Sequence, residues 1–162
     1  MDIDATVNSL FFTNHLLIKE VFLVISYSLF VLLFFFFALQ LIKFKKEKDL
    51  KYLNSGAWIV FLIIFFELLK FFSGRERPNG NPGSFPSNHA GLSFFISYLW
   101  PTKNKLLKSG LFIWAVLISL SRLVLNLHWF TDVLAGSILG LLFAFLTEKI
   151  NINKILKFVK KK

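Results

Sequence analysis

Two residues in the last third of the chain have the types and spacing of an activated nucleophile. His128 and Asp132 are four residues apart, so on a helix they would share one face and the carboxylate could reach the imidazole ring. Such a carboxylate fixes the tautomer of the ring and leaves the other ring nitrogen nucleophilic. A buried hydrogen-bonded pair at a helix start would show the same spacing, so this pair alone leaves a structural role open.

A second histidine follows residues that favour the start of a helix. Pro86 and Ser87 precede His89, and proline and serine are preferred at the first positions of helices. The free backbone N–H groups and the dipole at such an end form an anion site. We therefore expect His89 to act as a general acid beside a bound anion. The alternative interpretation is a polar helix cap with an interfacial histidine.

Three cations accompany these groups. Lys70 and Arg77 precede the first histidine motif, and Arg122 precedes the second. Three cations that converge beside a helix N-terminus suit a phosphate of charge near −2. Taken singly, each could instead anchor the chain to lipid headgroups. Arg75 and Glu76 are secondary candidates for headgroup contacts, and Glu67 is expected to pair with Lys70 one helical turn away.

The elements that must position these residues are membrane helices. The 162-residue chain is 56% hydrophobic and contains 22 phenylalanines and no cysteine. One long apolar run without charge is enough for a helix that crosses a bilayer, and several others approach that length. We predict an all-α, polytopic transmembrane bundle that forms a single domain over residues 1–162. Its five expected spans cover residues 21–42, 52–72, 86–101, 109–120 and 129–146.

The remaining segments are expected to lie at the membrane surface. Residues 5–18 are too short and too polar to span and predict a short interfacial helix, and the lysine-rich tail 148–162 predicts an amphipathic one. The loops at 43–51 and 101–108 and this tail hold 14 of the 19 basic residues. The positive-inside rule then places them in the cytoplasm and all the motif residues on the outer face. The lysines therefore indicate membrane topology and not nucleic-acid binding.

Taken together, the three motifs are far more specific than any of them alone. Lys70-x6-Arg77-Pro78, Pro86-Ser87-x-His89 and Ser121-Arg122-x5-His128-x3-Asp132 resemble the tripartite signature of the type 2 phosphatidic acid phosphatase superfamily. Ten specified positions match in order, and the resemblance covers residues 70–132. One position departs, because Asn88 stands where the family usually has glycine. Asparagine is the next most tolerant residue for positive φ.

The resemblance implies roles for each residue. His128 would form a phosphohistidine, Asp132 would orient it, and His89 would protonate the leaving oxygen and then activate water. Phosphate would be held by the cations and by the helix amides, at Lys70, Arg77, Ser87, Asn88 and Arg122. No cofactor is implied, and the two carboxylates of the motif region, Glu76 and Asp132, are too few for a magnesium site.

The resemblance also implies a substrate class and a location. We expect a lipid phosphatase of the cytoplasmic (inner) membrane whose site faces the periplasm or exterior. Lipid A 1-phosphate is the leading substrate by overall likeness. The alternatives are undecaprenyl diphosphate, phosphatidylglycerophosphate and a lipid phosphotransferase reaction, in which a lipid hydroxyl replaces water. A lipid-binding protein without activity would need only the cations, so the two histidines and the aspartate favour an enzyme.

The membrane orientation is directly testable, because the chain has no cysteine. Single-cysteine variants at Asn81 and Asn126 should react with a membrane-impermeant thiol reagent from outside the cell. Variants at Lys46, Lys105 and Lys161 should react only after the membrane is opened. Labelling of position 81 from the cytoplasmic side alone would contradict the orientation.

Overall fold

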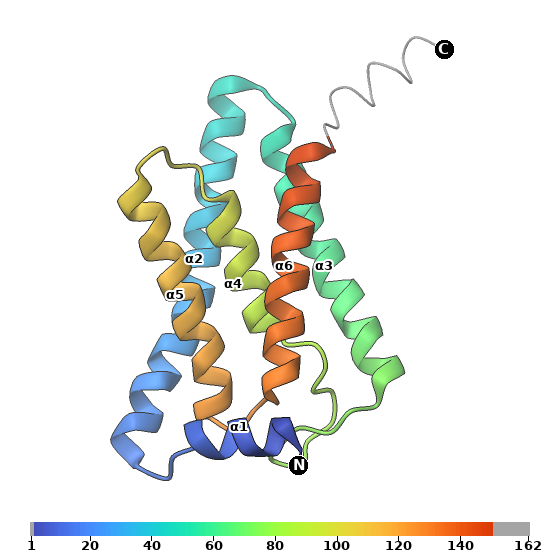
Figure 1. The fold of residues 1–162 in the computed structure, drawn as a ribbon. Coiled ribbons are helices and arrows are strands. Elements are labelled where there is room, and N and C mark those ends of the chain that lie inside the picture. Colours follow the sequence, from blue (N-terminus) through green and yellow to red (C-terminus); the bar gives the residue numbers. More distant parts are fainter. Residues whose placement is uncertain (1, 151–162) are drawn as a thin grey trace.

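The structure of the protein is a computed structural model, which describes residues 2–150. This part of the chain consists of helices joined by short connections, and it contains no strand. The predicted all-α bundle is confirmed (Figure 1). The helices are α1 (Ile3–Phe11), α2 (Leu16–Glu47), α3 (Lys51–Ser73), α4 (Asn88–Leu99), α5 (Lys105–Val124) and α6 (Phe130–Lys149).

Four of these helices, α2, α3, α5 and α6, are long and apolar enough to cross a membrane. The third predicted span, 86–101, is instead the 12-residue helix α4, about 18 Å long at the usual rise per residue. It is the buried centre of the bundle, and its fully buried side chains include Phe95 and Ile96. The predicted helix is present but shorter than the segment 86–101, because Ser87 caps its start and Trp100, which precedes Pro101, is not helical.

Several helix ends differ from the sequence-based boundaries. α2 extends to Leu16 and Glu47, beyond the predicted 21–42, because lysine and glutamate lower hydropathy without disfavouring a helix. The predicted interfacial segment 5–18 is divided: α1 ends at Phe11, and residues 16–18 already belong to α2. The predicted tail helix falls on residues 148–162, of which 151–162 lie outside the described residues.

Glycines bring α4 and α6 into close contact. A Cβ atom on Gly140 would lie 2.1 Å from the carbonyl oxygen of Gly91, and one on Gly136 would lie 2.5 Å from that of Ser87. Both obstacles are backbone atoms, which cannot rotate away. The absence of side chains at these positions therefore lets the start of α4 approach the second and third turns of α6 closely, next to two of the three motifs.

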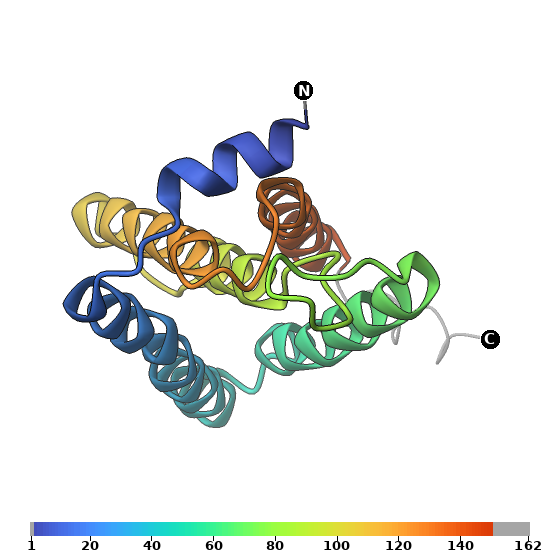
Figure 2. The same cartoon turned by 90° about the horizontal axis from the view of Figure 1, so that it is seen from below.

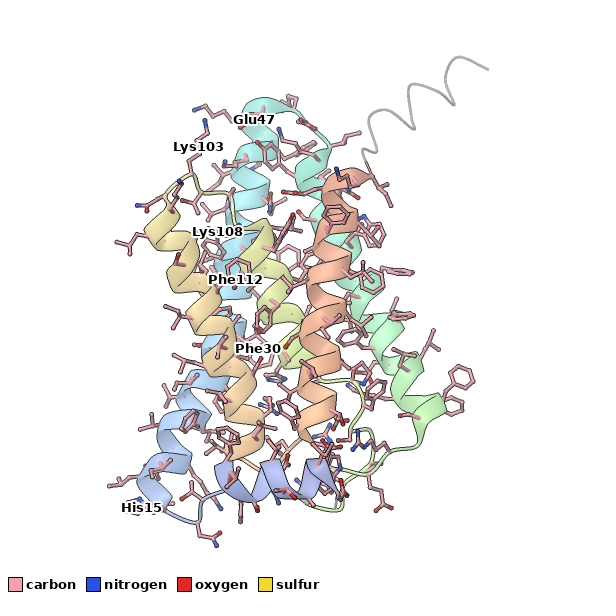
Figure 3. The ribbon with its side chains drawn as sticks, in the orientation of Figure 1. His15, Phe30, Glu47, Lys103, Lys108 and Phe112 are labelled. Atoms are coloured by element: carbon pink, nitrogen blue, oxygen red, sulfur yellow. The ribbon has the colours of Figure 1, made fainter. Side chains whose placement is uncertain are left out.

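The motif loops gather at one end of the bundle. Figure 1 shows the 74–87 loop and the α5–α6 connection at the same end, with α1 lying across it. Seen from that end, α1 passes over the ends of α5 and α6 (Figure 2). Glu47, Lys103 and Lys108 lie at the opposite end, whereas His15 lies at the motif end (Figure 3). The predicted separation of motifs from lysine-rich loops is thus present in the fold.

The α4–α6 contact predicts a position-specific loss of stability. Gly140→Ala should lower the free energy of unfolding by about 1–3 kcal/mol, because the new methyl group would overlap a backbone carbonyl. Thermal unfolding in detergent measures this as a lower Tm. Gly110→Ala in α5 is the matched control, because no atom lies within 4 Å of the added Cβ. Equal Tm values for the two variants would contradict the close contact.

Candidate active site

A cavity of about 320 Å³ opens among the motif residues. Six of the eight predicted site residues line it, namely Lys70, Arg77, Asn88, His89, Arg122 and His128. Its other walls are apolar and come from Leu29 and Phe30 of α2, Ile63 of α3 and Leu92 of α4. Four helices and two loops therefore combine a cationic floor with a hydrophobic wall, an arrangement that suits a phosphate attached to an apolar group.

His128 is held with one ring nitrogen free. It lies in the connection between α5 and α6, with only 3% of its surface exposed, and Nδ1 lies 2.7 Å from the carbonyl oxygen of Ser84. A carbonyl can only accept, so Nδ1 carries the proton and Nε2 holds the lone pair of the neutral ring. Burial, reinforced by Arg122 and Arg77, holds the pKa of His128 below its ordinary value, although Asp132 opposes this shift. The ring is therefore neutral at neutral pH and available as a nucleophile.

The geometry of Asp132 differs from the expected direct bond to the imidazole. α6 begins at Phe130, so His128 precedes the helix, and Asp132 Oδ2 lies 3.7 Å from Nδ1. The same oxygen accepts hydrogen bonds from the Ser84 hydroxyl and from the Trp129 N–H at 2.8 Å. Asp132 thus acts on His128 through its charge and through Ser84, whose carbonyl holds the ring.

Two arginines that line the cavity have unused donors. Arg122 is 6% exposed and donates from Nη1 to Ser26, while Arg77 donates from Nη2 to the Gly83 carbonyl at 3.3 Å. The Nε atoms of both are buried and have no hydrogen-bond partner within residues 2–150. An unpaired buried donor is costly, so these two N–H groups indicate an anionic ligand.

Lys70, which lines the cavity, is paired with Glu67 of the same helix. Its Nζ is 2.7 Å from Glu67 Oε1, which confirms the expected pair one turn apart. The same oxygen accepts from Asn88 Nδ2 at 2.7 Å. Glu67 therefore positions Lys70 and Asn88 together at the cavity edge.

The start of α4 contributes in a different way from expectation. Ser87 is fully buried, caps the helix through its hydroxyl and donates its own N–H to the Asp132 carbonyl at 3.0 Å. That amide is therefore engaged and does not face the cavity. The amides of Asn88 and His89 belong to the first turn, where N–H groups have no partner within the helix, so these two amides are available to bind an anion.

Sequence reasoning missed several supporting residues. Ser84, Ser26 and Phe30 contact the site from a loop and from α2, and α1 adds Asp4 and Asn8. One signal for these residues was present in the sequence: Ser26 lies within the apolar run 21–42, and a polar residue inside a membrane span is a functional candidate. Arg75, expected near a headgroup, instead pairs with Asp132 and Asp4, and Glu76 accepts from Trp129 through its backbone carbonyl.

No group of three or more histidine, aspartate or glutamate side chains lies close enough to hold a metal ion anywhere in residues 2–150. The donors that line the cavity are nitrogen cations and imidazoles, which suit an anion better than a hard cation such as magnesium. The expectation of a reaction without a metal stays a prediction.

Comparisons with known proteins agree on one family. The model of the PAP2 superfamily matches residues 51–155. A PA-phosphatase related-family protein of Dictyostelium discoideum is 30% identical; the match covers 70% of this chain and 54% of that protein. The chain thus spans about half the length of this curated relative.

Two solved structures share the fold. The crystal structure of Aquifex aeolicus LpxE has a TM-score of 0.77 at 23% identity, and the match covers 93% of this chain and 97% of that one. The first transmembrane PAP2 type phosphatidylglycerolphosphate phosphatase, from Bacillus subtilis, has a TM-score of 0.77 at 25% identity, with 90% and 83% covered.

The free arginine donors predict a measurable anion affinity. Arg122→Gln should weaken the binding of orthovanadate by roughly 10- to 100-fold, the equivalent of one charged hydrogen bond of about 1.5–3 kcal/mol. Isothermal titration of the purified protein in detergent measures this. Lys19→Gln removes a cation at the same end but outside the cavity and should leave the affinity unchanged. Equal affinities for the two variants would rule out Arg122 as an anion ligand.

Proposed function

The chain belongs to the PAP2 superfamily, and from this premise we propose that it is a phosphatase that hydrolyses a membrane lipid phosphate. One observation carries the proposal. The same cavity contains the free nitrogen of His128, the second histidine His89 and two arginines with unpartnered donors. Binding an anion needs only the cations, whereas a neutral imidazole beside a second histidine adds a nucleophile and an acid.

The proposed reaction has two steps. His128 Nε2 attacks phosphorus in line, the bond from phosphorus to the leaving oxygen breaks, and that oxygen takes a proton from His89. The product of this step is a phosphohistidine. In the second step His89, now neutral, removes a proton from water, and the water oxygen bonds to phosphorus. The bond from phosphorus to His128 Nε2 breaks, which releases phosphate and restores the neutral imidazole.

The cations stabilise the charge that develops on the phosphoryl oxygens. Arg77 and Arg122 offer their unpartnered Nε–H groups, and Lys70 and the first-turn amides of α4 complete the set. Donors that are already in place in a dry cavity need no reorganisation during the reaction, which is why such groups contribute strongly to catalysis. Asp132 stabilises the positive charge on His128 as the new bond forms.

The cavity walls support a lipid that enters from the side. Phe30 and Ile63 line the cavity and are also exposed on the outer surface of the bundle, at 56% and 37%. They belong to α2 and α3, whose outward faces are covered with large apolar side chains. A lipid could therefore keep its chains in the bilayer while its phosphate reaches the arginines.

Lipid A 1-phosphate is the leading substrate, by overall likeness of the sequence; the fold shared with Aquifex aeolicus LpxE is compatible with it. Undecaprenyl diphosphate is the first alternative. Phosphatidylglycerophosphate is the second alternative. The likeness to the Bacillus subtilis phosphatidylglycerolphosphate phosphatase, at a TM-score of 0.77 and 25% identity, supports it. The proposed location is the cytoplasmic membrane, with the cavity facing the periplasm or exterior, because the lysine-rich loops lie at the opposite end. A lipid phosphotransferase with the same phosphohistidine is the competing reaction.

The test is phosphate release from these three lipids by the purified protein in detergent. Release should occur without any acceptor alcohol and should persist in EDTA. His128→Ala should abolish it on every lipid, and Asp132→Asn should lower it by up to roughly 10⁴-fold, as in the comparable triad change. His15→Ala, which alters an exposed histidine at the same end, should retain full activity.

Each outcome has a distinct meaning. Normal turnover by His128→Ala would remove the nucleophile assignment. Phosphate transfer only in the presence of an alcohol would replace the hydrolase by the transferase, and loss of activity in EDTA that magnesium restores would contradict the metal-free mechanism.

A further inference from the structure

Arg75 occupies an unspecified position of the first motif, yet it makes more side-chain contacts than the motif cations beside it. Its Nη1 donates to Asp132 Oδ1 at 2.8 Å and to Thr131 Oγ1 at 2.7 Å, and its Nη2 donates to Asp4. Arg75 does not line the cavity. The guanidinium instead lies behind the site and joins a carboxylate of α1 to the carboxylate of α6.

Helix α1 holds the His128 segment from the other side. Asn8 donates from Nδ2 to the His128 carbonyl at 3.0 Å and accepts from the Phe130 N–H at 3.1 Å. Asp4 accepts from the Thr131 N–H at 2.9 Å and from the Thr131 hydroxyl at 2.7 Å. Both side chains are more than nine-tenths buried. α1 thus satisfies the first free N–H groups of α6 and fixes the backbone on both sides of Trp129.

Ser84 connects Arg75 to the imidazole. Its N–H donates to the Arg75 carbonyl at 2.9 Å, its hydroxyl donates to Asp132, and its own carbonyl accepts from His128 Nδ1. A displacement of Arg75 or of Asp132 would therefore move the acceptor that sets the ring orientation.

The network contains two carboxylates, those of Asp132 and Asp4, and both are paired with the guanidinium of Arg75. Asp132 is fully buried, and the positive group bound to it is Arg75. Burial raises the pKa of Asp4, but hydrogen bonds from Thr131 and Arg75 bring its net pKa below the ordinary value, so Asp4 is ionised as well. Without Arg75, the buried Asp132 carboxylate would be left with the His128 ring, at 3.7 Å, as its nearest group able to become a cation.

We propose that Arg75, Asp4 and Asn8 form a positioning unit that sets the orientation and the charge state of His128. Its role in turnover rests on the phosphatase function proposed above. None of the three side chains lines the cavity, so they are positioning residues and not catalytic ones. Helix α1, which carries Asp4 and Asn8, therefore contributes to the active site and is more than a segment at the surface.

The direction of the charge effect follows from all the groups around the ring. Asp132 of α6 favours the protonated ring, whereas burial, Arg122 of α5 and Arg77 of the loop oppose it. Lys70 of α3 and His89 of α4 also line the cavity beside the ring. α1 acts through Arg75, and α2 presents Leu29 and Phe30. When Arg75 is removed, the Asp132 charge is no longer neutralised, and the pKa of His128 must rise.

The experiment compares Arg75→Gln, Arg75→Lys, Asp4→Asn and Asn8→Leu with Glu20→Gln, which removes an exposed carboxylate at the same end. Two readouts are combined: kcat and KM across pH, and the ring titration of His128 by nuclear magnetic resonance. The titration is resolvable because the chain has three histidines. Thermal unfolding identifies any variant that fails to fold.

Arg75→Gln should lower kcat about 10- to 100-fold, the range found for outer partners of functional histidines in metal sites, with KM nearly unchanged. Its kcat/KM should also fall off at a higher pH than in the wild type, because a raised pKa protonates the nucleophile earlier. Arg75→Lys should restore the wild-type titration. Asp4→Asn and Asn8→Leu should lower kcat without raising the pKa, since Arg75 stays on Asp132, and Glu20→Gln should match the wild type.

An unchanged His128 titration in folded Arg75→Gln would overturn the charge role. Wild-type kcat in Asn8→Leu and Asp4→Asn would overturn the role of α1. The titration is read without substrate, so a failure of the phosphatase assay leaves it interpretable and separates the two proposals.

Discussion

The buried carboxylate of Asp132 is the constraint on which the rest of the site depends. A charge with no exposed surface is tolerated only when it is paired and fully hydrogen-bonded. Arg75, the Ser84 hydroxyl and the Trp129 N–H supply those bonds. The requirement draws the 74–87 loop, the start of α6 and, through Arg75, helix α1 into one assembly. This assembly also fixes the position of His128, because the ring donates a hydrogen bond from Nδ1 to the Ser84 carbonyl.

The low dielectric that makes an isolated Asp132 costly also strengthens the interaction of the cavity cations with any anion that enters. Arg122 and Arg77 have Nε–H donors that no group in residues 2–150 satisfies, and an unpaired buried donor is costly. In the proposed reaction the substrate phosphate accepts from these donors. Negative charge thus lies behind His128 and positive charge in front of it. In the proposed reaction, Asp132 stabilises the positive charge that forms on His128, and the arginines hold the phosphoryl group on the other side of the ring.

The membrane setting explains why a short helix lies at the centre. The long helices α2, α3, α5 and α6 expose apolar side chains outward and leave α4 enclosed. Because α4 has only 12 residues, its N-terminus ends within the assembly and carries its free amides and positive dipole end to the cavity. The glycines facing it on α6 set how closely that end approaches Asp132.

Local patterns determined much of this protein. Hydropathy predicted the helices. The types and spacing of Lys70, Arg77, His89, Arg122 and His128 predicted a common site, because the positive-inside rule places all three motifs on the same face of the membrane. Only the tertiary structure decided which side chains are hydrogen-bonded to one another. Arg75 reaches Asp132 across 57 positions, and Asn8 reaches His128 across 120. Such bonds have no period in the sequence: they arise when packing brings unsatisfied buried groups together, and the need to pair them selects the partners.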